Sequence, residues 1–109
     1  MIVNPCINYT SKKLEETLKL LEKNYKIDFF SIGSSTLSTP IYSVKIGTGP
    51  IKLAYFASIH ANESITTNLL IKFIEDICNL YTSGSKRILN LFSKVTFYII
   101  PLVNPDGVD

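Results

Sequence analysis

The sequence has a single histidine, His60, and only two cysteines among its 109 residues. Any site that needs two imidazole ligands would therefore require two copies of the chain to meet. Cys6 and Cys78 are not spaced like a metal site or a disulfide framework. We expect two free thiols in a reducing compartment.

Long apolar runs and blocks of one charge are also missing. No run approaches the roughly 20 residues that cross a bilayer. The N-terminus lacks a basic start followed by an apolar stretch, so we see no signal peptide and expect a soluble, cytoplasmic protein with no membrane partner. Eleven basic and nine acidic residues give a net charge of +2, and they form no basic stripe. Charge therefore gives no reason to expect a nucleic-acid partner.

The residues that are present indicate a globular domain. Hydrophobic residues make up 46% of the sequence and charged residues 18%. The length suits one domain, or a piece of one, with a core of modest size.

Helical periodicity occurs in three places. Leu14, Leu18 and Leu21 predict an amphipathic helix that Thr10 or Ser11 caps and that ends near Asn24. A second helix is predicted near 62–81, with the residues at i, i+4 spacing forming its buried stripe: Ile65, Leu69, Phe73, Ile77 and Tyr81. Its polar residues should face away or lie at the edges: Thr66, Asn68, Lys72, Glu75 and Asp76. A short helix is predicted over 86–92.

Four runs predict strands near 28–33, 41–47, 51–58 and 95–101. The third run is apolar almost throughout, as a central strand covered on both faces would be. Short connections favour antiparallel neighbours, whereas the last β-α-β unit should be parallel. The sequence therefore predicts an α/β fold with a mixed sheet of about four strands and flanking helices.

His60 and Glu63 form the one constellation that points to chemistry. His60 lies where the third strand gives way to the long helix, and the carboxyl ends of strands are where α/β sheets bind ligands. Residues three apart on a helical turn project to the same side, so an imidazole nitrogen and a carboxylate oxygen could converge on one Zn²⁺. The pattern is short, however. A histidine that bonds a backbone carbonyl and a glutamate that stabilises a helix N-terminus are the alternatives.

Two segments resemble the zinc carboxypeptidase family. Residues 57–67 resemble its H-x-x-E zinc motif, and residues 101–109 resemble its N-P-D-G segment, in the same order and with a helix and a strand between them. The first segment is most similar to bacterial γ-D-glutamyl-meso-diaminopimelate peptidases, which share His-Ala-Asn-Glu followed by Ile-Thr-Thr. The resemblance covers roughly residues 9–109, so we expect this chain to be the N-terminal portion of such a catalytic domain. Ser64, where some members carry tryptophan, leaves the substrate fit open.

The resemblance implies that His60 and Glu63 are the first two zinc ligands. It places Asn104–Gly107 in a loop near the floor of the metal site, where a plain structural turn is an equally good interpretation. Gly107 could permit a positive φ there, and Asn62 could cap the helix. The third ligand, a histidine, and the general-base glutamate lie further downstream in the family, so no catalytic residue is assigned here and the substrate-binding residues are unknown.

Two hypotheses follow. The first is a metallopeptidase portion, acting in the complete enzyme on cell-wall peptides with γ-D-glutamyl-diaminopimelate bonds, but inactive and at most a weak zinc binder as this chain alone. The second is a non-catalytic α/β module that acts by association. We also expect self-association through the strand at 95–100 or the apolar surface beside it, because an incomplete sheet exposes an edge.

Overall fold

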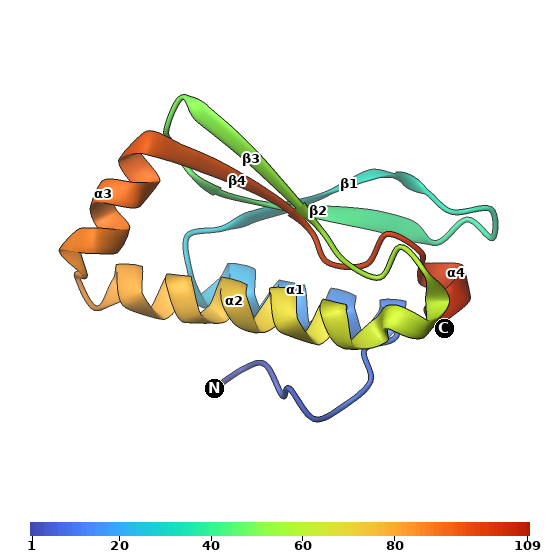
Figure 1. The fold of residues 1–109 in the computed structure, drawn as a ribbon. Helices are drawn as coiled ribbons and strands as arrows, with labels where there is room; N and C mark the ends of the chain where they lie inside the picture. Colours follow the sequence, from blue (N-terminus) through green and yellow to red (C-terminus); the bar gives the residue numbers. More distant parts are fainter.

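The computed structural model describes all 109 residues, Met1 to Asp109. The elements follow in the order α1 (Ser11–Asn24), β1 (Asp28–Ser34), β2 (Pro40–Gly47), β3 (Ile51–Phe56), the 3-10 turn η1 (Ala61–Glu63), α2 (Ser64–Thr82), α3 (Lys86–Lys94), β4 (Val95–Ile100) and α4 (Pro105–Val108). Helices α1 and α2 lie on one side of a four-stranded mixed sheet, and no helix covers the other side (Figure 1). The predicted α/β class is confirmed, and each strand lies within two residues of its predicted bounds.

The strand order is β1-β2-β4-β3. β4 pairs parallel with β3, as predicted for the last β-α-β unit, and antiparallel with β2. The expectation that the short connection makes β2 and β3 neighbours is wrong, because β4 lies between them. The connection passes over the start of β4 so closely that a Cβ on Gly49 would lie 1.9 Å from the carbonyl carbon of Lys94. Glycine therefore permits the crossing that separates the two strands.

β3 is an edge strand, so the expectation of a covered central strand is wrong for this chain. All six of its residues are exposed, and Ile51 and Phe56 are 56% and 55% exposed. The covered central strand is β4, which is buried at five of six positions by its own chain. Strand β4 is therefore not available as a surface for self-association. The exposed apolar surface beside β4 belongs to β3.

Helix α1 matches its prediction. The Thr10 side chain accepts a hydrogen bond from the backbone N–H of Lys13 at 3.2 Å and caps the helix. The predicted apolar stripe, Leu14, Leu18 and Leu21, is buried. This stripe joins the core that α1 shares with α2, β2 and β4.

Helix α2 lies within two residues of its predicted bounds, but the predicted burial of its faces is partly wrong. Ile65 and Leu69 are 68% and 69% exposed, whereas Asn68 and Glu75, which we expected at the surface, are buried. Residues 1–9 account for the burial of Asn68 and Glu75, because they pack on α2 through hydrogen bonds to these two side chains. An N-terminal arm thus covers a side of α2 that periodicity alone assigns to solvent.

Both cysteines are free, Cys6 at the surface and Cys78 in the core. Among the helices, none has the length and apolarity that a membrane crossing requires.

Candidate metal site

The candidate ligands lie in the turn that leads from β3 into α2. The chain leaves β3 through Ala57 and Ser58, which are buried, and Ser58 adopts a positive φ of 51°. His60 then occupies the N-cap position of η1 with an extended backbone. The positive φ of Ser58 is costly for a residue with a side chain, so the surrounding bonds must hold Ser58 in place.

His60 and Glu63 contact one another directly. Nδ1 of His60 lies 3.0 Å from Oε1 of Glu63, and the His60 backbone N–H donates to the other carboxylate oxygen at 3.4 Å. Both side chains are accessible, at 73% and 45% of their surface. The hydrogen bond from the His60 ring, and then that from its backbone N–H, lowers the pKa of Glu63 below the usual glutamate value.

This pair fits two corners of a zinc site. Ligands about 2.0–2.2 Å from a tetrahedral ion are roughly 3.4 Å apart, so the two donor atoms would separate by a few tenths of an ångström. Their solvent exposure leaves the approach open. The chain provides no group of three or more His, Cys, Asp or Glu side chains that could hold a metal ion together.

A chain of hydroxyl groups fixes the backbone beneath the pair. Thr66 Oγ1 accepts the Ser58 backbone N–H at 2.9 Å and donates to the Glu63 carbonyl at 2.7 Å. Thr67 donates to the Pro101 carbonyl at 2.6 Å, and its hydroxyl oxygen lies 2.6 Å from Ser58 Oγ, which also donates to the Glu63 carbonyl at 3.2 Å. These bonds tie the end of β3, the first turn of α2 and the end of β4 into one unit.

Sequence reasoning did not assign these hydroxyl residues a role. It treated Thr66 as a residue facing away and Ser58 only as part of the motif. The available signal was the run of small hydroxyl residues on both sides of His60 and Glu63, at the point where an apolar strand ends. Hydroxyl groups in such a place commonly bond nearby backbone atoms.

The loop 104–107 lies against the turn that carries His60, as the resemblance implied. The Asn104 backbone N–H donates to the Ser58 carbonyl at 3.0 Å, and the Asn104 side chain caps the short helix α4. The expected positive φ at Gly107 is wrong. Gly107 is needed for space, because a Cβ there would lie 2.9 Å from the Cβ of Ala61.

One other sequence expectation is resolved at this turn. Asn62 lies inside η1 and caps no helix, because His60 and Glu63 hold the two N-cap positions. Neither of the two main cavities has His60 or Glu63 in its lining. The candidate ligands are therefore an exposed pair on the surface, above a hydrogen-bonded turn.

Comparison with known proteins identifies the family. The sequence profile of the zinc carboxypeptidases matches residues 14–109, nearly the whole chain. The chain belongs to the zinc carboxypeptidase family. It is 34% identical over 113 residues to the gamma-D-glutamyl-L-diamino acid endopeptidase 1 of Lysinibacillus sphaericus, an alignment that covers 99% of this chain and 28% of that protein.

Solved structures of the family share the fold. Thrombin-activatable fibrinolysis inhibitor superposes with a TM-score of 0.83 at 25% identity, over 94% of this chain and 27% of that one. A metallo-carboxypeptidase from Burkholderia cenocepacia gives a TM-score of 0.79 at 21% identity, over 92% of this chain and 28% of that one. This zinc carboxypeptidase chain thus spans about a quarter of the length of the relatives that it matches.

Proposed function

We propose that this chain supplies the first two zinc ligands, His60 and Glu63, of a metallopeptidase. The observation that carries the proposal is the 3.0 Å contact between an imidazole nitrogen and a carboxylate oxygen at the carboxyl end of β3. When bound, zinc polarises the carbonyl of a peptide bond and lowers the pKa of a water molecule. The part of this chain is to hold two donor atoms in place through Ser58, Thr66 and Thr67.

The proposed substrate is a cell-wall peptide with a γ-D-glutamyl-diaminopimelate bond. The segment from His60 to Thr67 supports it through its resemblance to diaminopimelate peptidases. The name of the Lysinibacillus sphaericus relative specifies a γ-D-glutamyl-L-diamino acid bond, the class to which this bond belongs.

We further propose that the 109-residue chain by itself neither turns over peptides nor binds zinc tightly. Catalytic zinc normally has three protein ligands, and this chain offers two. Titration calorimetry with Zn²⁺ should therefore give at most weak binding, which His60→Ala abolishes. Nanomolar binding by a verified monomer would contradict the two-ligand proposal.

The activity test compares two proteins. A polypeptide that carries these residues together with a downstream histidine and glutamate should cleave a γ-D-glutamyl-diaminopimelate peptide, and a chelator, His60→Ala or Glu63→Gln should abolish that cleavage. The 109-residue chain should leave the same peptide intact. Chelator-sensitive turnover by the 109-residue chain would refute the proposal that the chain lacks part of the catalytic site. Cleavage that survives both substitutions would refute the ligand assignment.

A second candidate is association through β3, which the exposure of that strand favours. Leu53 and Tyr55 are 38% and 40% exposed, and the outer edge of β3 has no partner strand. An unpaired apolar edge pairs readily with a second copy of the same edge. The 109-residue chain should therefore form dimers or larger assemblies whose mass, measured by light scattering, rises with concentration.

The other edge strand provides a matched control. Ile32 on β1 is also about half exposed. Leu53→Lys should shift the chain to monomer, because a charge on the pairing edge opposes a second copy. Ile32→Lys should leave the assemblies intact. A wild-type chain that stays monomeric at high concentration would exclude the association module.

A further inference from the structure

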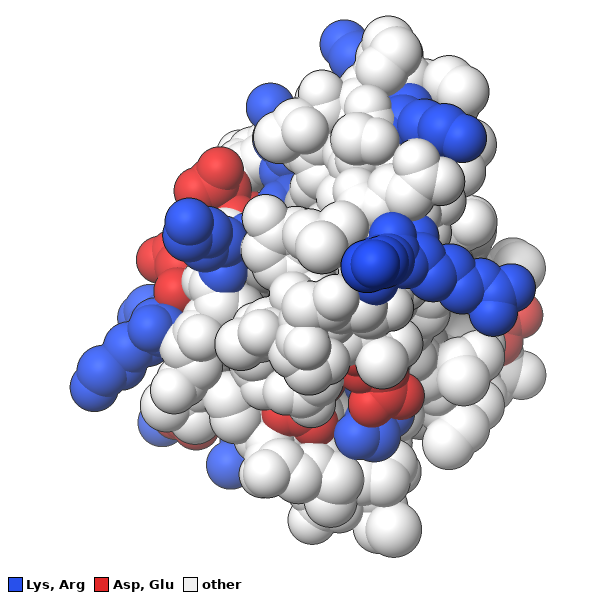
Figure 2. All heavy atoms as spheres, turned by 90° about the vertical axis from the view of Figure 1, so that its left-hand side faces the viewer, with Lys and Arg blue, Asp and Glu red and all other residues white.

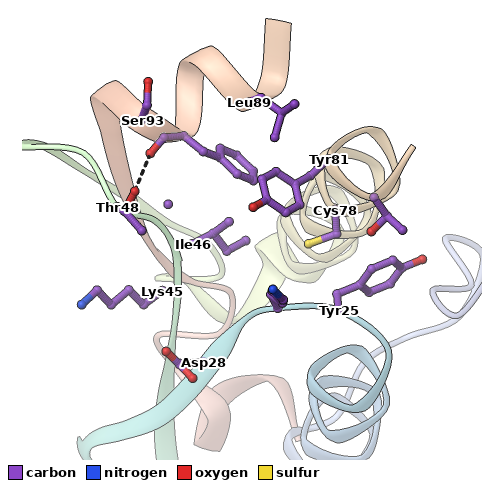
Figure 3. A pocket seen from close by; sticks show the side chains of 13 residues that line it. Tyr25, Asp28, Lys45, Ile46, Thr48, Cys78, Tyr81, Leu89 and Ser93 are labelled. Atoms are coloured by element: carbon purple, nitrogen blue, oxygen red, sulfur yellow. Dashed lines mark hydrogen bonds between the residues drawn. The ribbon is translucent and has the colours of Figure 1, made fainter. Parts of the chain in front are cut away.

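A cavity of about 380 Å³ opens at the far end of α2 from the metal-ligand pair, between α2, α3 and the paired ends of β1 and β2 (Figure 3). Cys78 in its lining is 15 positions along the chain from Glu63, about 22 Å at 1.5 Å per helical residue. The volume lies within the roughly 300–1,000 Å³ of small-molecule pockets. The cavity is therefore a separate place on the molecule from the candidate zinc site.

The floor of the cavity is apolar. Ile46, Cys78 and Phe92 are each more than nine-tenths buried. The ring of Tyr81 stacks on Phe92 with a centroid distance of 5.1 Å and an interplanar angle of 25°. Leu89 of α3 is 42% exposed, and Figure 3 shows its side chain and that of Tyr81 beside the same space. An aromatic ring could bury its surface here.

The charged side chains around the cavity leave its interior neutral. Ile46 belongs to the core, so Lys45, one position earlier on β2, projects from the opposite face of the sheet, as Figure 3 shows. Asp28 is the direct cross-strand partner of Lys45 and projects from that same face. Lys26, the one other charged residue in the lining, is exposed. Figure 2 looks onto the end of the molecule that carries α3 and shows lysine and arginine side chains around a largely uncharged centre.

Tyr81 provides a hydrogen-bonding group to the cavity. Its hydroxyl has no hydrogen bond within the chain, and Figure 3 shows it directed from α2 toward β2. The Tyr25 hydroxyl, by contrast, bonds to Asn79 and points away from the cavity. The hydroxyls of Thr48 and Ser93 bond to backbone carbonyls. The Tyr81 hydroxyl is therefore free to donate a hydrogen bond to a ligand or to accept one from it.

We propose that this cavity binds a small neutral aromatic molecule that carries one amide or hydroxyl group. The ring lies against Cys78, Phe92 and Leu89, and the polar group forms a hydrogen bond with the Tyr81 hydroxyl. A charged ligand would give up part of its hydration without gaining an ion pair inside the cavity. A purely apolar ligand would cover the Tyr81 hydroxyl without replacing its hydrogen bonds to water. Binding at this place does not involve zinc, so it stands or falls separately from the proposed function.

The test is a chemical-shift titration of the ¹⁵N-labelled 109-residue chain with three probes that share one ring: benzamide, benzoate and toluene. Benzamide should shift the amides of Ile46, Gly47, Tyr81 and Leu89 saturably. Benzoate has nearly the shape of benzamide but should bind about tenfold more weakly, because its charge loses hydration. Toluene should bind about fivefold more weakly, because it forms no hydrogen bond. Failure of benzamide to saturate at these amides would overturn the proposal, as would binding of benzoate or toluene that equals or exceeds that of benzamide.

Tyr81→Phe isolates the hydrogen bond, because this variant keeps the ring that stacks on Phe92. It should weaken benzamide about fivefold and leave the binding of toluene unchanged. Tyr98→Phe is the matched control, because Tyr98 is also partly buried but does not line the cavity, so its affinity for benzamide should equal that of the wild type. An equal loss in the two variants, or no loss in Tyr81→Phe, would show that the proposal is wrong.

Two further variants test the ring contact and the neutrality of the cavity. Leu89→Ser should weaken benzamide and toluene by the same factor, about threefold, because both rings lose the same apolar contact. Lys26→Gln should leave the affinity for benzamide unchanged, because a neutral ligand forms no ion pair with the ammonium group. Wild-type affinity of Leu89→Ser for both probes would contradict the proposed position of the ring. A loss of benzamide affinity in Lys26→Gln would contradict the neutral mode of binding.

Discussion

The hydroxyl of Ser35 donates a hydrogen bond of 2.6 Å to Oδ1 of Asp106, across 71 residues of sequence. The other carboxylate oxygen of Asp106 accepts the backbone N–H of Leu37 at 3.1 Å. Asp106 thus joins the turn between β1 and β2 to the loop that supports His60. The aspartate of the N-P-D-G segment has a structural role in this chain, as the alternative interpretation of that segment held.

Removing this bond should destabilise the fold. We expect Asp106→Ala to lower the free energy of unfolding by about 1–3 kcal/mol, and Ser35→Ala by about 1 kcal/mol, because the first removes two hydrogen bonds to a charged acceptor. Urea unfolding measures both, and the double variant should lose less than the sum, since one bond is shared. Ser34→Ala is the control, because the Ser34 side chain has no hydrogen bond to lose. An equal effect of Ser34→Ala would contradict the assignment.

The contact between His60 and Glu63 predicts a dependence on pH. The folded-state pKa of Glu63 is lowered, chiefly by the His60 ring. The contribution of Glu63 to stability is therefore fully present above its unfolded pKa of about 4.3 and is lost as pH falls through the folded value. In His60→Ala the Glu63 pKa should rise toward the ordinary value, as an NMR titration of the carboxyl carbon would measure. An unchanged pKa would mean that the backbone N–H alone accounts for the shift.

Glu75 should anchor the N-terminal arm. Its side chain is fully buried, and its carboxylate accepts the backbone N–H groups of Ile2 at 2.5 Å and Val3 at 3.2 Å. Lys72 provides a charge 3.4 Å away. Glu75→Gln should cost about 1–2 kcal/mol, because hydrogen bonds to a charged acceptor are replaced by bonds to a neutral one.

Hydrogen exchange gives a second readout for the arm. The amides of Ile2 and Val3 should exchange faster in Glu75→Gln than in the wild type, because their acceptor is weaker. Glu16→Gln is the control, since Glu16 is exposed and its one ion pair, with Lys13, is 4.0 Å long. Unchanged protection of Ile2 and Val3 would show that apolar packing alone holds the arm.

The two cysteines should differ in reactivity. Burial, and then the charge of Glu75, raises the pKa of Cys78 to about 12, whereas Cys6 is exposed. The thiolate is the reactive form, so a disulfide reagent at pH 8 should modify one thiol per native chain and two in guanidinium chloride. Cys6→Ser should remove the native reaction. Rapid reaction of the native Cys6→Ser variant would show that the core opens around Cys78.

Some of the fold was predictable because it depends on neighbours in sequence. The leucine stripe of α1, its Thr10 cap and the four strand segments follow from local periodicity and local hydrogen bonds. The pairing of His60 with Glu63 is equally local, because three residues on one helical turn bring both side chains together. Their role as zinc ligands and the cytoplasmic location of the protein remain predictions.

Other features depend on contacts between distant segments. Local pattern does not reveal that the N-terminal arm covers Glu75 and Asn68, so periodicity assigns both residues to solvent. Similarly, the apolar run of β3 resembles that of a covered strand, because a run of side chains does not show which strands lie beside it.

The sequence by itself determined the elements of this protein and the adjacent pair His60 and Glu63, because each is set within a few residues of chain. Only the tertiary structure decided that β4 lies inside the sheet and β3 at its edge. It also decided that Asp106 binds the β1–β2 turn. The physical reason is that these outcomes depend on which distant surfaces bury one another, and that is settled by packing of the whole chain.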